Sequence, residues 1–143
     1  MTRLITVAAA QLGPIEREES KTSVVKRMTD MMRHAHSRGA RLVVFPEMAL
    51  TTFFPRWYIE DEAELDAFYE TEMPSNETQP LFDLSKQLGV GFYLGYSEMF
   101  FDDTGKKRRF NTAILVNQQA EIVGKYRKVH LPGHATYEPE REW

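Results

Sequence analysis

The sequence predicts an α/β domain built around a mixed β-sheet, and three observations lead to this class. Segments typical of strands alternate with segments typical of helices along the 143 residues. The last strand segments follow one another closely around a hairpin turn, which predicts antiparallel pairing beside strands that are joined by helices. The chain is 42% hydrophobic and 27% charged, which is sufficient for one globular core. We therefore expect a single domain.

The first half of the chain predicts two strands separated by a helix. Residues 4–12, LITVAAAQL, form an apolar and partly β-branched run that is typical of a strand buried on both faces. Apolar residues recur at helical spacing from about 21 to 38, and Gly39 is placed to end that helix. The run RLVVFPE, 41–47, predicts a strand that Pro46 ends, because proline cannot donate a hydrogen bond to a central ladder.

The second half predicts two helices followed by three strands. A short acidic helix is expected within 61–70, and a longer one from near Gln79 to Gly89. The strands are expected at 90–100, 108–117 and 120–131. The segment DDTGKK between the first two of these strands is typical of a hairpin turn.

Composition and charge exclude several classes of function. The 18 Lys and Arg against 21 Asp and Glu give a formal net charge of −3, which is not the basic balance of a nucleic-acid binder. No apolar run approaches the roughly 20 residues that span a bilayer, and no secretory signal precedes the first strand, so we expect no membrane partner and a cytoplasmic location. The sequence has no cysteine, which excludes disulfides, thiolate metal sites and a thiol nucleophile from these residues.

Glu47 is the first candidate for chemistry. It follows the proline that ends a predicted buried strand, and open α/β sheets bind their ligands at the carboxyl ends of strands. Partial desolvation at this place is expected to raise the pKa of Glu47 and to make it a general base. The alternative is an ordinary carboxylate in a surface loop, or a charge at the start of a helix.

Lys128 is the second candidate, within the basic run GKYRKVHLPGH. The alternation of a strand places Lys128 on one face with Tyr126 and His130. Lys125 and Arg127 then share the opposite face. The alternative is an edge strand that its charges protect against aggregation.

Two further groups of side chains have weaker indications. His130 and His134 are four residues apart, but the intervening Leu-Pro-Gly disfavours the helix that this metal-ligand spacing needs, so we expect no metal. The aromatic side chains in TTFFPRWYIEDE either line a pocket or pack in the core, and the residues leave both open. They are Phe53, Phe54, Trp57 and Tyr58.

Two motifs together resemble the nitrilase superfamily, the carbon-nitrogen hydrolases with a Glu, Lys and Cys catalytic set. They are VVFPEMALT around Glu47 and FNTAILVNQQAEIVGKYRKVHLPGH from 110 to 134. Within the superfamily, LTTFFPRW, DEAELDAFYETEMP and LGYSEM look like N-carbamoyl-D-amino acid amidohydrolases. The resemblance extends from about residue 4 to 138 and covers the amino-terminal half of the family's length. It implies half of a four-layer α-β-β-α sandwich with a mixed sheet, so that residues 1–143 are the amino-terminal part of one domain.

The resemblance implies roles for three residues. Glu47 matches the family's general base, and Lys128, the second lysine of KYRK, matches the cation that stabilises the tetrahedral oxyanion. His130 matches a histidine with a supporting role beside that lysine. The family's nucleophile is a cysteine on a later strand, and this sequence ends before that strand, so we expect no nucleophile in this chain. The resemblance implies no metal and no organic cofactor.

Several functions stay open. The leading interpretation is the amino-terminal part of an amidohydrolase that cleaves the carbamoyl C–N bond of N-carbamoyl-D-amino acids to the D-amino acid, ammonia and carbon dioxide. Without the cysteine, the 143 residues alone should be inactive. The alternatives are half of a split enzyme that a second chain complements, a non-catalytic interaction module of the same fold, and another amidase of the superfamily. The family implies a small-molecule substrate, no nucleic acid, and a homo-oligomer at full length.

Overall fold

Five strands form one mixed sheet, in the order β1-β2-β3-β4-β5. The structure, a computed structural model, describes residues 4–131. Three strands are parallel: β1 (Val7–Ala9), β2 (Leu42–Val44) and β3 (Gly91–Phe101). Two more continue the sheet with antiparallel pairing: β4 (Lys107–Val116) and β5 (Ile122–Arg127). The predicted α/β class with a mixed sheet is therefore confirmed, including the hairpin between β3 and β4.

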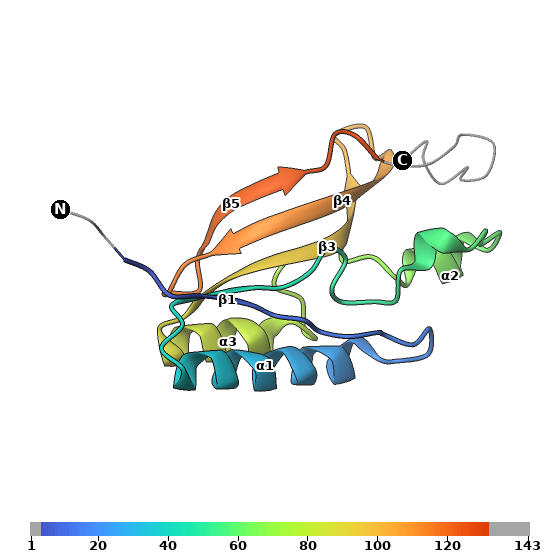
Figure 1. Cartoon of the computed structure of the whole chain (residues 1–143). Coiled ribbons are helices and arrows are strands. Elements are labelled where there is room, and N and C mark those ends of the chain that lie inside the picture. The colour runs from blue at the N-terminus through green and yellow to red at the C-terminus, as the bar shows by residue number, and fades with distance from the viewer. Residues whose placement is uncertain (1–3, 132–143) are drawn as a thin grey trace.

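Two helices lie side by side on one face of this sheet, as Figure 1 shows: α1 (Lys21–Ser37) and α3 (Gln79–Leu88). The side chain of Ser20 accepts a hydrogen bond from the Ser23 N–H at 3.2 Å, which caps the start of α1. Gly89 ends α3 in the left-handed conformation, with a φ of 62°. Both helices have the bounds that the sequence predicts. The short helices η1 (Phe54–Arg56) and α2 (Glu62–Asp66) belong to the long connection between β2 and α3.

The core lies between the two long helices and the sheet. The rings of Phe45 and Phe82 meet the ring of Phe92 edge-on, with centroids 6.4 and 5.1 Å away. Each large apolar side chain buried in this way stabilises the fold by about 1.5–3 kcal/mol. Fully buried side chains come from α1, α3 and the three strands β2, β3 and β4: Val24, Met28, Met32, Val43, Leu81, Phe92, Leu94, Ile114 and Val116.

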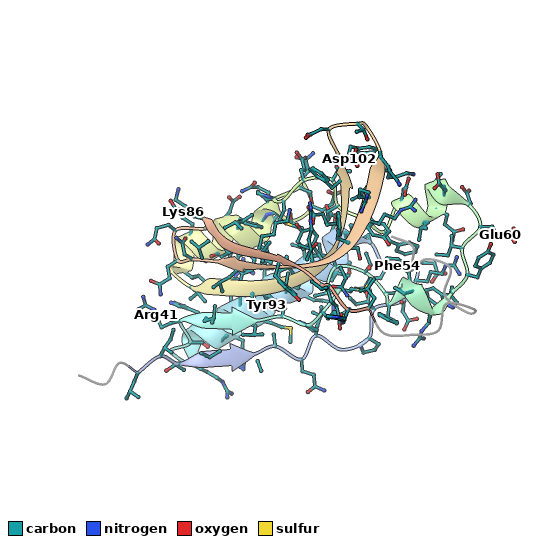
Figure 2. All side chains as sticks on the ribbon, turned by 90° about the horizontal axis from the view of Figure 1, so that it is seen from above. Arg41, Phe54, Glu60, Lys86, Tyr93 and Asp102 are labelled. Atoms are coloured by element: carbon teal, nitrogen blue, oxygen red, sulfur yellow. The ribbon has the colours of Figure 1, made fainter. Side chains whose placement is uncertain are left out.

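The opposite face of the sheet is open, since no described helix packs against it. Figure 2 looks down on the molecule and shows Tyr93 near the middle of the strands. Tyr93 pairs with Leu115, and the register puts Val7 and Tyr126 on the same side. Val7, Leu115 and Tyr126 are 48, 41 and 60% exposed. An apolar sheet face in water is typical of a surface that another layer covers.

The prediction of a strand buried on both faces within 4–12 is wrong. β1 is three residues long, and Val7 is half exposed. Among residues 4–131, β1 pairs with a strand on one side only, and no helix covers its open face. The apolar run that suggested complete burial thus reflects an edge strand with one face against α1.

We expect the 143-residue chain, expressed alone, to associate or to fold poorly. The open apolar face and the two edge strands favour contact between chains over exposure to water. Size-exclusion chromatography and thermal unfolding of the purified chain check this. A monomeric elution volume together with a sharp cooperative melt contradicts the prediction.

Candidate active site

Glu47 lies on a tight turn that follows β2 and crosses β3. The N–H of Phe45 donates to the carbonyl oxygen of Tyr93 at 3.0 Å, which extends the parallel pairing of the two strands. The N–H of Ala49 donates to the carbonyl oxygen of Gly95 at 2.8 Å. These two hydrogen bonds fix both ends of the turn to the same strand. The position of Glu47 is thus set by β3 and not by its own loop.

Gly95 lets this turn approach the strand closely. A Cβ atom on Gly95 would lie 2.8 Å from the Cα of Glu47 and 2.9 Å from the carbonyl oxygen of Pro46, both below real contact distances. Met48, directly after Glu47, has a backbone φ of 49°, which is uncommon for residues other than glycine, asparagine and aspartate. A glycine at position 95 is therefore a condition for the backbone of Glu47 to lie where it does.

Lys128 is the first residue after β5 and lies beside Glu47. Its backbone N–H donates to the carbonyl oxygen of Asn111 on β4 at 2.8 Å. Its Nζ donates to Oε1 of Glu47 at 2.7 Å. The side-chain amide of Asn111 donates to the same oxygen at 2.6 Å. The structure thus brings Glu47 and Lys128, 81 residues apart in the sequence, into direct contact.

A pocket of about 420 Å³ lies beside this pair, on the open face of the sheet. The residues that line it come from β3, β4, the turn after β2 and the end of β5: Glu47, Tyr93, Gly95, Asn111, Thr112, Ala113, Tyr126, Lys128 and His130. The predicted sharing of one face by Tyr126, Lys128 and His130 is confirmed. His130 is exposed at the pocket wall.

The two other basic residues of β5 face the other way, as predicted. Lys125 and Arg127 both bind the carboxylate of Glu98 on the helix side of the sheet. β5 is also an edge strand, so the alternative explanation for its charges fits its position as well. The alternation of the strand assigns one set of cations to the pocket and another to a buried carboxylate.

The expectation of a raised pKa for Glu47 is wrong. The hydrogen bond from Lys128 lowers the pKa of Glu47 below its ordinary value of 4.5. Partial burial acts in the opposite direction but is outweighed, and the hydrogen bond from Asn111 adds to the lowering. The Glu47 side chain is 53% exposed, so desolvation is weaker than the end of a buried strand suggested. Glu47 is therefore a carboxylate, able to accept a proton, at neutral pH.

The aromatic side chains of the loop after β2 were expected either to line a pocket or to pack in the core, and the structure shows both. Phe54 is fully buried and stacks on Phe68 with ring centroids 4.7 Å apart. Tyr58 and Phe53 are exposed, and Phe53 lines a second hollow of about 260 Å³ that Glu47 also borders. Part of the loop is thus a small core of its own, and part faces the surroundings of Glu47.

Sequence reasoning missed Asn111 and Gly95. Asn111 lies within the FNTA stretch, where an amide inside a predicted strand was a signal for a specific hydrogen bond. Gly95 interrupts the run GFYLGYSEMF, and a glycine inside a strand indicates close approach of another backbone. Neither signal named the partner, because Glu47 lies 64 residues before Asn111 and 48 residues before Gly95.

No group of three His, Asp or Glu side chains that could hold a metal ion is present among residues 4–131. His134, the partner in the nominal histidine spacing, lies outside the described residues, as do Pro132 and Gly133 of the same stretch. Within the same range, no helix has the length and apolar character needed to cross a membrane.

Comparisons with known proteins give a matching family and several relatives. Residues 6–143 match the family model of the carbon-nitrogen hydrolases. Human omega-amidase NIT2 is 26% identical over 126 residues, which are 85% of this chain and 41% of the relative. N-carbamoylputrescine amidase of Solanum lycopersicum is 25% identical over 138 residues, 95% of this chain and 42% of the relative. The chain thus spans about two fifths of the length of these curated relatives.

Solved structures show the same fold. The yeast protein Nit3, a member of branch 10 of the nitrilase superfamily from Saccharomyces cerevisiae, superposes with a TM-score of 0.71 at 23% identity, over 95% of this chain and 46% of Nit3. A mutant amidase from Nesterenkonia sp. AN1, whose active-site cysteine has added acrylamide, gives a TM-score of 0.66 at 18% identity, over 95% of this chain and 48% of the amidase. The α/β fold of these neighbours is therefore the fold of the described residues.

Replacing Lys128 by Met is expected to raise the pKa of Glu47. The substitution removes the hydrogen bond and the positive charge that hold the carboxylate in its ionised form, and leaves the partial burial that opposes ionisation. A ¹³C NMR titration of the Glu47 carboxyl, assigned by its loss in Glu47→Gln, measures the change. A pKa that stays the same or falls in Lys128→Met contradicts the contact.

Replacing Gly95 by Ala is expected to destabilise the protein by about 1–3 kcal/mol, because the new methyl group overlaps the backbone of Glu47. Urea unfolding of the natural-length protein measures the loss. Gly124→Ala is the matched control, since a Cβ there meets only the Leu115 side chain at 3.7 Å. Equal midpoints for the two variants would show that the turn does not need the glycine.

Proposed function

Because the chain belongs to the carbon-nitrogen hydrolase family, we propose that it forms the general-base and oxyanion part of an amidase active site. Glu47 is the general base in this proposal, and Lys128 stabilises the oxyanion. The observation that carries the proposal is the 2.7 Å contact between Lys128 Nζ and Glu47 Oε1 at the wall of a pocket. A carboxylate and an ammonium group at this distance can both reach one reacting group in the adjoining pocket, the first to take its proton and the second to balance its charge.

The proposed nucleophile is a cysteine outside these 143 residues, which contain none. The mutant Nesterenkonia amidase, with acrylamide added at its active-site cysteine, supports this assignment by its shared fold. Either a continuation of this chain or a separate chain supplies the cysteine. In both cases residues 1–143 are the amino-terminal part of one hydrolase domain, and the open sheet face is the side on which the remainder packs.

The proposed reaction is acyl transfer in two steps. Glu47 takes the proton of the cysteine thiol, the sulfur attacks the substrate carbonyl carbon, and the Lys128 ammonium balances the charge that develops on the carbonyl oxygen. The C–N bond then breaks, and ammonia leaves with the proton that Glu47 returns. Water, deprotonated by Glu47, attacks the thioester and releases the acid. His130 supports Lys128 at the pocket wall. This scheme needs no cofactor.

We propose N-carbamoyl-D-amino acids as substrates. The support is the likeness of LTTFFPRW, DEAELDAFYETEMP and LGYSEM to the amidohydrolases of these compounds. The carbamate that the second step releases would break down to carbon dioxide and the D-amino acid. Relatives include an omega-amidase and an N-carbamoylputrescine amidase, so other amides and carbamoyl amines are the alternative substrates. A cytoplasmic location and a homo-oligomer at full length belong to the same proposal.

The purified 143-residue chain is expected to release no ammonia from an N-carbamoyl-D-amino acid, because it lacks the cysteine. Ammonia release that scales with protein concentration and disappears in Glu47→Gln would overturn the proposed cysteine. The same assay with an N-carbamoyl-L-amino acid, N-carbamoylputrescine and an ω-amide, on the natural-length protein or the complemented pair, distinguishes the substrates.

In that active protein, Glu47→Gln and Lys128→Met are each expected to lower kcat by about 10²–10⁴-fold, because one removes the base and the other the oxyanion cation. Steady-state ammonia release measures the loss. Glu72→Gln and Lys106→Met are the controls, since the first side chain is exposed and the second lies in the hairpin turn. Activity within a few-fold of the unmodified protein in both site variants contradicts the assigned roles.

A further inference from the structure

We propose that Glu98 is a positioning residue for Lys128: its buried carboxylate holds the end of β5 and so aims the Lys128 ammonium at Glu47. This inference rests on the proposed function for the role of Lys128. It makes the site depend on a second carboxylate besides Glu47, on the opposite face of the sheet from the pocket. Glu98 itself does not line the pocket.

Glu98 receives four hydrogen bonds. It lies on β3 and is 5% exposed. Arg127 donates twice, from Nε to Oε2 at 2.9 Å and from Nη2 to Oε1 at 2.8 Å. Lys125 Nζ donates to Oε1 at 2.5 Å, and the hydroxyl of Thr112 donates to Oε2 at 2.7 Å. A bidentate contact between a guanidinium and a carboxylate is possible in one relative orientation only, so Glu98 fixes the orientation of the Arg127 side chain as well as its position.

The charge of Glu98 is secure at neutral pH. Burial alone would raise its pKa, but the hydrogen bonds from Arg127, Lys125 and Thr112 outweigh burial and lower the pKa to about 2. Two other titratable groups face it. Burial raises the pKa of Tyr96, which is therefore neutral, and the buried Glu70 forms an ion pair with Lys21 at 2.6 Å. Glu98 is thus a permanent anion that Lys125 and Arg127 neutralise.

The end of β5 has few other attachments. Among residues 4–131, β5 is an edge strand that pairs with β4 alone, and this ladder ends at Arg127. The Arg127 guanidinium lies 4.0 Å from the ring centroid of Phe110, which adds to its hold. Beyond it, one backbone hydrogen bond, from Lys128 to Asn111, continues the pairing. The Phe100 ring centroid lies 4.8 Å from the Arg127 guanidinium. On the helix side, the contacts of Glu98 are therefore the hydrogen bonds that hold Lys125 and Arg127 at this end of the strand.

Strand alternation connects this attachment to the pocket. Lys125 and Arg127 point to the helix side because Glu98 binds them there, so Lys128 must point to the open side. A slip of one residue would bring Lys128 to Glu98 and remove it from Glu47. Two cations on one carboxylate oppose that slip, since a shifted strand cannot present both of them to Glu98.

A titration of Glu47 tests the proposal without any substrate, in the protein at its natural length. In Glu98→Gln the pKa of Glu47, followed by ¹³C NMR, is expected to rise in the same direction as in Lys128→Met and by a smaller amount. Removal of a nearby negative charge alone would lower this pKa. The sign therefore separates a loss of Lys128 positioning from a direct electrostatic effect. A pKa that falls or stays constant in Glu98→Gln overturns the proposal.

Glu98→Asp is the second variant, in case the neutral amide prevents folding. It keeps the buried charge but is shorter by one methylene group, so it is not expected to reach both Lys125 and Arg127. A rise in the Glu47 pKa is expected here too, and an unchanged pKa contradicts the positioning role. Glu62→Gln is the matched control, because Glu62 also pairs with two basic side chains, Lys107 and Arg109, but on β4 and away from Lys128. Glu62→Gln should not raise the Glu47 pKa.

The outcome of the Glu47 titration does not depend on whether the protein hydrolyses amides. Glu98 can prove dispensable for the Glu47 titration while ammonia release still requires Glu47 and Lys128. Conversely, Glu98 can control the titration in a protein that has no amidase activity. In that second case the positioning holds and the proposed function fails.

Discussion

The register of β3, β4 and β5 is the constraint on which the rest of the structure depends. Neighbouring residues on these strands face opposite sides, so one side chain belongs to the helix-covered core and the next to the open pocket. Phe92, Leu94 and Glu98 lie on the covered side. Tyr93 and Gly95 lie on the open side. The folding of the core and the assembly of the pocket are consequences of the same pairing.

Two ion pairs of the same chemistry differ because of their solvent exposure. Glu98 is almost completely buried and takes its hydrogen bonds from four donor groups, so its charge is fixed. Glu47 is half exposed and takes hydrogen bonds from Lys128 and Asn111. The first arrangement resists change, whereas the second remains open to a reacting group. Carboxylates paired with basic side chains thus hold the strands together on one face of the sheet, and on the other face such a pair borders the pocket.

Most of the fold and three residues of the candidate site, Glu47, Lys128 and His130, could be predicted from the sequence. Helical spacing and the glycines at 39 and 89 gave both long helices, because these signals are local. Strand alternation gave the two faces of the basic run correctly. The roles of Asn111 and Gly95 could not be predicted, because their partners lie on a distant turn whose place depends on the sheet. The predicted direction of the Glu47 pKa shift was wrong for the same reason. The sequence indicated partial burial, but it did not indicate the hydrogen-bond donors that outweigh it.

The two donors that meet at Glu47 also distinguish its two oxygens. Lys128 and Asn111 both bind Oε1, and Oε2 accepts no hydrogen bond from residues 4–131. The lone pairs of Oε2 are the ones left for an incoming proton. Proton transfer to this carboxylate therefore has a preferred direction. An acidic group has to approach Oε2, because the hydrogen-bond donors of Lys128 and Asn111 already occupy Oε1.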